Sequence, residues 1–317
     1  MSDTAIKLTP FVRQEYERDV HVPASIAEVE RELPLAERLW NTPWARRALI
    51  LILLALIWES YARCPNVISD LLAMAWHGNF TGFPACSANP LLFPTFTDTM
   101  TAWWDGIVSG VIPARLAVTL RMLVMGYALG LSLAAIFVTF AVSTRFGTDL
   151  LSTLTSMFNP LPAIALLPLA LLWFGLGAPS IVFVIVNSVL WAVALNTHAG
   201  CTAVSETLRM AGQTFGLKGF RYVVKILMPA AFPAILSGLK IGWAFAWRTL
   251  IAAELVFGVS SGSGGLGWFI FENRNTLDTA NVFAGLLTVM AVGLLVEGVI
   301  FRTIEAKTIR RWGMQHG

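Results

Sequence analysis

Long apolar segments with few charged residues recur along this chain and constrain its fold more than any other feature. Five of them lie at about 116–142, 150–174, 179–200, 231–258 and 281–303. Each is long enough to cross about 30 Å of hydrocarbon at roughly 1.5 Å per residue. A shorter sixth segment runs from about Trp44 to Ala62 and contains Glu59. With 56% hydrophobic and only 13% charged residues, the chain is unlike a water-soluble globule. The sequence therefore predicts an all-α polytopic membrane protein with about six transmembrane helices.

Positive charges gather in the connections on one side of these predicted helices. They are Arg38, Arg46, Arg47, Arg145, Arg209, Lys218, Arg221, Lys225, Arg302, Lys307, Arg310 and Arg311. The opposite connections hold little beyond Arg63 and Arg274. Cytoplasmic loops of membrane proteins are enriched in Lys and Arg. We therefore expect a multi-pass protein of the bacterial inner membrane with both termini and the 201–229 loop in the cytoplasm, and no binding to nucleic acid.

The predicted helices divide the chain into five parts. They are a cytoplasmic N-terminal tail at 1–45, a first transmembrane helix at 46–63, an extracytoplasmic loop with an interfacial helix at 64–114, a transmembrane core at 115–308 that contains the 201–229 loop, and a cytoplasmic C-terminal tail at 309–317. The first part is too long and too acidic for the start of a signal peptide. We therefore expect it to be retained.

Two of the three cysteines, Cys64 and Cys86, fall in the predicted outer loop. A disulfide between them is chemically permitted in a periplasm, but sequence gives no distance between the two, so bridged and free states both stay open. The chain has no CxxC and no paired His, so we expect no metal site.

The 201–229 loop has the composition of a compact cytoplasmic element. Residues 205–215 predict a short helix, Gly216 stands in a helix-ending position, and Pro229 begins the next apolar segment. One interpretation of 210–229 is simply a basic connection on the cytoplasmic side.

The spacing within this loop resembles the loop motif of permeases from binding-protein-dependent type I ABC importers. That motif reads Glu-Ala-Ala, three residues, Gly, nine residues, Ile, any residue, Leu, Pro. The matching positions here are Met210, Ala211, Gly212, Gly216, Ile226, Met228 and Pro229. Segments at 119–121, 126–130, 160–177, 195–200, 235–242, 252–256 and 264–270 resemble the nitrate/sulfonate/taurine/bicarbonate branch of that family. The resemblance covers about residues 115–308.

Three positions of the loop depart from the family motif. Met210 stands in place of Glu, Gly212 in place of the second Ala, and Met228 in place of Leu. The first change removes a carboxylate that could pair with an ATPase. Glu206, one turn earlier, is the alternative carboxylate for such a contact.

The resemblance implies a MetI-like permease fold. It also implies a transport subunit that catalyses no reaction itself. It implies a coupling helix in the 201–229 loop that docks on cytoplasmic ABC ATPase subunits, a periplasmic substrate-binding protein, and a second permease copy, as a homodimer or with a close relative. ATP and Mg would bind to the partner ATPase, because this chain has no GxxxxGK[ST] motif, and no cofactor is expected here. The implied solute is nitrate, a sulfonate such as taurine, bicarbonate or a related organic anion.

Several polar residues interrupt the fifth apolar segment. Arg248 lies near its middle, where an ionisable group calls for a functional hypothesis. Its guanidinium could bind an oxyanion, or it could pair with Glu254, Glu297 or backbone carbonyls. Lys240, Trp247 and Glu254 recur every seven residues and share one helix face, which we expect to face a pathway or a partner subunit.

A glycine cluster follows this segment. Gly262, Gly264, Gly265 and Gly267 fit GxGxxG, but they follow a membrane helix instead of a strand, so we expect no nucleotide site. The family resemblance implies a bend near an outer gate.

The alternative function is an ion-coupled secondary transporter acting alone. Such a protein is expected to show internal repeats and acidic residues at the midplane, and neither is evident in this sequence. A membrane enzyme is disfavoured because no catalytic constellation stands out.

Overall fold

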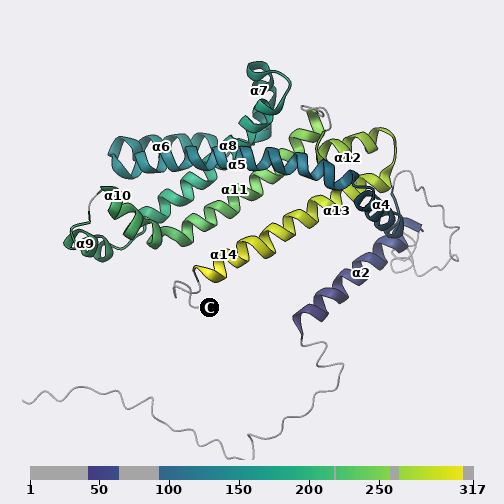
Figure 1. Cartoon of the computed structure of the whole chain (residues 1–317), viewed down its shortest axis with the longest axis horizontal. Coiled ribbons are helices and arrows are strands. Elements are labelled where there is room, and N and C mark those ends of the chain that lie inside the picture. The colour runs from purple at the N-terminus through teal and green to yellow at the C-terminus, as the bar shows by residue number, and fades with distance from the viewer. Residues whose placement is uncertain (1–41, 64–92, 218, 258–263, 310–317) are drawn as a thin grey trace, which may run out of the picture. The chain divides into compact units, whose positions relative to one another are not determined.

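The computed structural model describes residues 42–63, 93–217, 219–257 and 264–309, and all regular structure in these ranges is helical (Figure 1). This confirms the all-α prediction. The chain separates into two compact units, residues 1–55 and 56–317. The contacts described below lie within the second unit.

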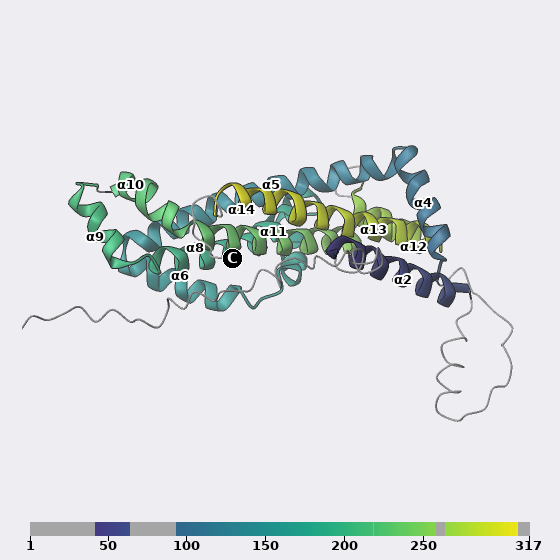
Figure 2. The ribbon, with the colours of Figure 1, turned by 90° about the horizontal axis from the view of Figure 1, so that it is seen from below.

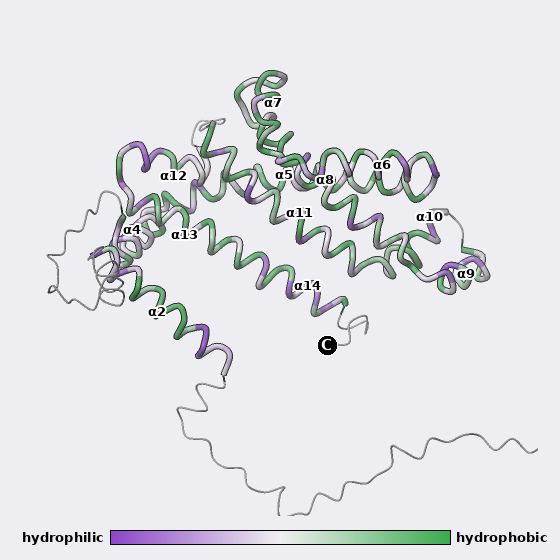
Figure 3. The backbone as a smooth tube through the Cα atoms, turned by 180° about the vertical axis from the view of Figure 1, so that it is seen from behind, coloured by the Kyte–Doolittle hydropathy of each residue, from purple (hydrophilic) through white to green (hydrophobic). Residues whose placement is uncertain are grey.

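The described residues form the following helices, in chain order. They are α2 (Pro43–Arg63), α4 (Phe96–Val108), α5 (Val111–Ser143), α6 (Arg145–Phe158), η1 (Ala163–Leu166), α7 (Leu167–Phe174), α8 (Ala178–Thr202), α9 (Glu206–Thr214), α10 (Gly219–Tyr222), η2 (Val223–Leu227), α11 (Met228–Phe257), α12 (Leu266–Asn275), α13 (Thr279–Leu295), η3 (Val296–Phe301) and α14 (Arg302–Lys307). Figure 3 shows that the long helices are largely hydrophobic and that hydrophilic residues gather in α9.

Four helical stretches are long and apolar enough to cross a membrane: Val111–Ser143, Ala178–Thr202, Val223–Val256 and Thr279–Lys307. They correspond to four of the six predicted segments. The predicted span at 150–174 is divided into two parts in the structure, because α6 and the η1–α7 pair are bent by 89° at a short break. Pro160 and Pro162 lie in that break, and proline has no backbone N–H and disfavours helix in the residue before it. Counted as one bent pair, these helices give a fifth candidate span.

The sixth predicted segment corresponds to α2. This helix carries Arg46, Arg47, Glu59 and Arg63, and it is not among the candidate spans. The described residues thus contain four or five candidate spans, a number compatible with the six predicted.

Helix α8 packs against both α5 and α11 and forms the centre of the second unit. Glycines allow these close approaches. A Cβ at Gly126 of α5 would lie 2.6 Å from Ile185 Cγ2, and one at Gly242 of α11 would lie 2.8 Å from Val193 Cγ2. Small residues let membrane helices come together in this way. As a result, 56% of the most apolar stretch of α8 is buried, against 28% or less for the other three spans.

A second group of helices surrounds α13. Helix α13 packs against α12 and α4. Figure 2 shows these three helices at the same end of the second unit. Trp103 Nε1 of α4 donates a hydrogen bond to Thr288 Oγ1 of α13 over 3.0 Å. Trp58 Nε1, near the end of α2, donates to the Pro94 carbonyl over 3.0 Å.

Some predictions fall where the structure gives no description. Cys64, Cys86 and Gly262 lie outside the described residues. Helix α4 lies in the segment where we expect an interfacial helix, but its place relative to a membrane stays a prediction, as does the division of the chain into five parts.

Candidate functional site

A short helix, α9, lies where the sequence predicts a helix at 205–215, and it ends sharply at Gly216. The backbone N–H of Gly216 donates to the Gln213 carbonyl over 2.9 Å, and that of Leu217 donates to the Gly212 carbonyl over 3.1 Å. Gly216 has φ +72°, a left-handed conformation that glycine adopts without strain. These two bonds close the helix in a Schellman motif.

The buried side of α9 packs on the segment that leads into α11. A Cβ added at Gly212 would lie 3.1 Å from both Tyr222 Cε2 and Ile226 Cγ1. Two positions of the loop motif, Gly212 and Ile226, are therefore brought into contact. Because the Tyr222 and Ile226 side chains lie so close, there is little room for a side chain at position 212, which gives a physical reason for glycine there.

The other side of α9 is exposed. Met210 is 55% exposed and Phe215 at the end of the helix is 82% exposed. Glu206 and Ala211 are also exposed. Leu208 is 39% exposed, so α9 and its C-cap present three large apolar side chains and one carboxylate on their exposed surface.

Arg209 attaches α9 to the end of α8. Its Nη2 donates to the Cys201 carbonyl over 2.7 Å and to the Thr202 carbonyl over 3.2 Å, and its Nε donates to the Val204 carbonyl over 3.2 Å. The last carbonyls of a helix lack intrahelical partners, and a cation there also complements the helix dipole. Sequence analysis placed Arg209 only among the cytoplasmic charges. The acceptors are backbone atoms, so no residue pattern could identify them.

Glu254 lies at the opposite end of α11 from this loop and is only 1% exposed. Its carboxylate accepts a hydrogen bond from the Thr119 hydroxyl over 3.0 Å and from the backbone N–H of Gly267 over 2.8 Å. The Thr119 hydroxyl in turn accepts the N–H of Leu266 over 2.8 Å. Glu254 and Thr119 thus satisfy two free amides at the start of α12, because Gly265 at its N-cap has no side chain to do so.

The glycine cluster packs against this carboxylate. A Cβ at Gly265 would collide with the Glu254 carboxylate, and a Cβ at Gly267 would lie 2.6 Å from Glu254 Cβ. Gly264 has φ +58°, and a Cβ there would meet the Trp268 ring. Three segments noted in the sequence, at 119–121, 252–256 and 264–270, are therefore brought together. A role for this cluster in an outer gate stays a prediction.

Lys240 and Trp247 lie on the same face of α11 as Glu254, and both are engaged within the chain. Lys240 Nζ lies 2.6 Å from Glu305 Oε2 of α14. Trp247 is 6% exposed and stacks on Trp243, with ring centroids 6.3 Å apart. This face of α11 thus contacts α14, the core and α12 in turn, and whether it also lines a pathway stays a prediction.

Arg248, on a neighbouring face of α11, is exposed. Its guanidinium lies 6.0 Å from the centroid of the Phe245 ring. Among the described residues it forms no ion pair with Glu254 or Glu297. Glu254 is instead occupied by Thr119 and Gly267.

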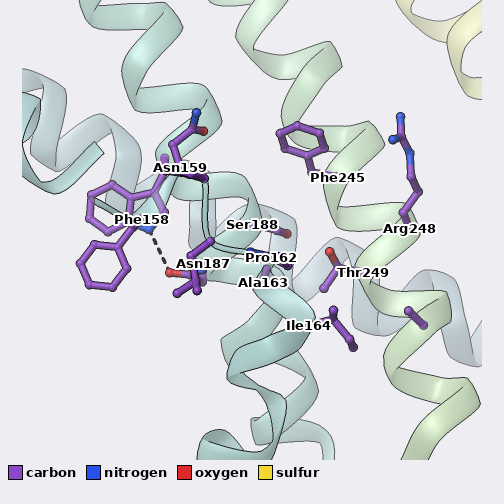
Figure 4. A pocket seen from close by; sticks show the side chains of 14 residues that line it. Phe158, Asn159, Pro162, Ala163, Ile164, Asn187, Ser188, Phe245, Arg248 and Thr249 are labelled. Atoms are coloured by element: carbon purple, nitrogen blue, oxygen red, sulfur yellow. Dashed lines mark hydrogen bonds between the residues drawn. The ribbon is translucent and has the colours of Figure 1, made fainter. Parts of the chain in front are cut away.

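A cavity of about 320 Å³ lies between the α6–α7 break, α8 and α11 (Figure 4). Its lining includes Asn187 from α8 and both Arg248 and Thr249 from α11. Asn187 Oδ1 accepts a hydrogen bond from Trp191 Nε1 over 2.9 Å, and the Trp191 ring stacks on Phe158 with centroids 5.1 Å apart. Figure 4 shows Asn187 turned toward Phe158 and Arg248 turned away from it on α11, so the polar side chains of this mostly apolar lining do not converge on one point.

Comparisons with known proteins cover the same region. The family model described as "Binding-protein-dependent transport system inner membrane component" matches residues 126–308, more than half of the chain. The nitrate import permease protein NrtB of Synechocystis sp. is 32% identical over 177 residues, 56% of this chain and 60% of that protein. The taurine transport system permease protein TauC of Escherichia coli is 32% identical over 148 residues, 47% of this chain and 52% of TauC. SsuC of Escherichia coli, named for aliphatic sulfonates transport, is 28% identical over 206 residues, 65% of this chain and 77% of SsuC.

Proposed function

The chain belongs to the family of binding-protein-dependent transport system inner membrane components, so it is a permease subunit of an ABC importer, and we propose that its solute is a small oxyanion or organic anion. This assignment favours the importer over an ion-coupled secondary transporter acting alone. As a family member it works with an ATPase and a substrate-binding protein.

The attachment of α9 is the observation that supports ATPase coupling through the 201–229 loop. Arg209 holds α9 to the end of α8, and Gly212 packs against Ile226, which leads into α11. A displacement of α9 by a cytoplasmic ATPase is therefore transmitted to two helices of the core. Met210 and Phe215 offer apolar contacts to that ATPase, and Glu206 offers the carboxylate that Met210 does not.

The relatives support the solute class. Their names refer to nitrate, taurine and aliphatic sulfonates, all of which carry a small group of negatively charged oxygens. An exposed arginine in an apolar helix suits such solutes, because the planar guanidinium can donate two parallel hydrogen bonds to an oxyanion.

The assembly follows from the same proposal. Two copies of this chain surround the pathway in the bacterial inner membrane, with both termini in the cytoplasm. ATP and Mg bind to the ATPase subunits, and ATP-driven closure of those subunits shifts the permease between inward-open and outward-open states. We expect no cofactor in this chain.

Substrate-stimulated ATP hydrolysis by the complex in lipid tests the proposal. A panel of small anions is presented on the binding protein, and Gly216→Pro is compared with wild type. Proline cannot adopt φ +72° and lacks the N–H that bonds to Gln213, so the end of α9 is disrupted. Gly298→Ala is the matched control, since a Cβ there meets nothing within 4 Å.

We expect one anion to stimulate hydrolysis in wild type and Gly298→Ala but not in an assembled Gly216→Pro complex. Equal stimulation in all three complexes would show that this loop does not couple the permease to the ATPase.

A further inference from the structure

We propose that Arg248 of one copy of this chain forms an ion pair with Glu297 of a second copy, and that two such reciprocal pairs set the contact between the copies. The inference rests on the proposed assembly of two copies around a pathway, and it names the residues that join them. It concerns the surface formed by α11 and by the helix that runs from α13 into η3.

The first argument is charge within apolar helices. Arg248 lies in the candidate span Val223–Val256 and Glu297 in the candidate span Thr279–Lys307, and both residues are exposed on this chain. Neither forms an ion pair within the described residues. Charged residues of membrane helices are costly in hydrocarbon and normally pair or face the interior of a bundle. The surface that carries these two charges is therefore unsuited to lipid.

The second argument is the depth of the two charges. Helices α11 and α13 lie side by side (Figures 1 and 2). Lys240 Nζ of α11 lies 2.6 Å from Glu305 Oε2 of α14. Further along α11, Trp247 Nε1 lies 3.8 Å from where a Cβ at Gly293 would stand, so the two helices run in opposite directions. With this register, the two charges lie within about 8 Å of one another along the helix axes, at roughly 1.5 Å per residue.

The third argument is that the two charges point to the same side of this helix pair. Arg248 directly follows Trp247, and Glu297 directly follows Val296. Both preceding residues are only 6% exposed, and Val296 packs with Leu236 of α11 in one buried cluster. Two antiparallel helices that face one another are related by a two-fold rotation about an axis perpendicular to both. The residue that follows each facing residue therefore turns to the same side.

A second copy supplies the missing partner for each charge. A two-fold axis along the membrane normal leaves the depth of every residue unchanged, and it makes each contact reciprocal. An axis that faces the midline between α11 and α13 places Arg248 of each copy against Glu297 of the other. The carboxylate uses two of the five N–H donors of the guanidinium, which leaves three for an anionic solute.

The surroundings of the two charges agree with this contact. Glu297 lies in η3, a π-helical stretch within the span, and such stretches occur frequently at functional sites. Large apolar side chains are exposed on the same two helices: Phe245 is 40%, Met290 54% and Leu294 71% exposed. Packed against a second copy, these side chains would exclude water from the ion pairs and strengthen them.

Charge reversal in two distinguishable copies tests the ion pairs. Two copies with different affinity tags are produced together with the ATPase, and the fraction of one copy that co-purifies with the other is measured. Arg248→Glu in both copies, or Glu297→Arg in both copies, places like charges across the interface. We expect co-purification to fall about tenfold in each case, because like charges that face one another at an interface are strongly unfavourable.

The decisive sample combines one copy that carries Arg248→Glu with one copy that carries Glu297→Arg. Across the interface both pairs are then of opposite charge, whereas within each copy the two positions have the same sign. We expect co-purification near the wild-type level. A combination that associates no better than the single reversals would overturn the proposal. Arg121→Glu in both copies is the control for reversal in an apolar helix, because Arg121 is exposed on α5, and it should leave co-purification unchanged.

Cross-linking covers the case in which reversed chains do not fold. In a background without the three native cysteines, one tagged copy carries Arg248→Cys and the other carries Glu297→Cys. Oxidation should join the two tags in one covalent dimer. Arg121→Cys in place of Arg248→Cys should give no such dimer. Copies that co-purify but do not cross-link through positions 248 and 297 would also overturn the proposal.

The outcomes distinguish the ion pairs from the importer function, because neither readout depends on ATP or solute. Wild-type copies that fail to co-purify, or that associate equally well with either single reversal, would overturn the ion pairs even if ATP-driven uptake is intact. Rescue in the mixed sample, in a complex that shows no ATP-driven uptake, would keep the ion pairs and refute the proposed function.

Discussion

The carboxylate of Glu254 accepts the backbone N–H of Gly267 over 2.8 Å, so a side chain from α11 caps the start of α12. Thr119 of α5 joins the same network through Glu254 and Leu266. Three helices from distant parts of the chain thus meet at one buried carboxylate. Buried polar groups are stable only while their partners are present, so the position of α12 depends on this network.

Thr119 offers the cleanest test of that network. Thr119→Val keeps the shape but removes the hydroxyl, which leaves the buried Leu266 N–H without its acceptor. We expect a loss of about 1–3 kcal/mol in the free energy of unfolding, because an unsatisfied buried group loses its solvation. Thr119→Ser keeps the hydroxyl and should cost much less. Thermal unfolding of the solubilised complex measures both variants, and equal losses would show that packing, not hydrogen bonding, is what Thr119 supplies.

The contact between Gly126 and Ile185 predicts a compensating pair of substitutions. Gly126→Ala places a methyl group 2.6 Å from Ile185 Cγ2 and should destabilise the chain by about 1–3 kcal/mol through overpacking. Ile185→Ala leaves a cavity and should also destabilise it. In the double variant the clash with Ile185 Cγ2 is gone, although the Cβ of residue 185 stays 2.7 Å from the new methyl group, so the losses should add only in part. A double-mutant cycle by thermal unfolding measures this coupling, and additive losses would contradict the close approach of α5 and α8.

Arg209 predicts a defect in coupling without loss of assembly. Arg209→Gln removes the cation from the carbonyls of Cys201 and Thr202, so α9 is held less firmly on α8. We expect the complex to assemble and to hydrolyse ATP, with solute transported per ATP reduced about fivefold or more. Arg221→Gln is the control, since Arg221 is exposed in the same loop. A similar reduction in both variants would assign the effect to net charge.

Sequence patterns predicted the parts of this fold that depend on local chemistry. Apolar length identified the long helices, and the spacing from Met210 to Pro229 identified α9 and its end at Gly216. The break at Pro160 and Pro162 was missed, because the apolar composition continues through it and helix length was judged from composition.

Contacts between distant helices could not be predicted in this way. The seven-residue spacing places Lys240, Trp247 and Glu254 on one face, but it carries no information on what that face meets. In the structure these residues meet Glu305, Trp243 and the start of α12. The carbonyl acceptors of Arg209 are backbone atoms that any residue possesses, so they leave no trace in the sequence.

ATP-driven uptake into proteoliposomes tests the central claim most directly. The chain is reconstituted with its ATPase, and labelled nitrate or taurine is supplied with the binding protein on the opposite side from ATP. We predict that solute accumulates only when ATP, the ATPase and the binding protein are all present. Accumulation by the chain alone on an ion gradient, unaffected by ATP, would contradict the account.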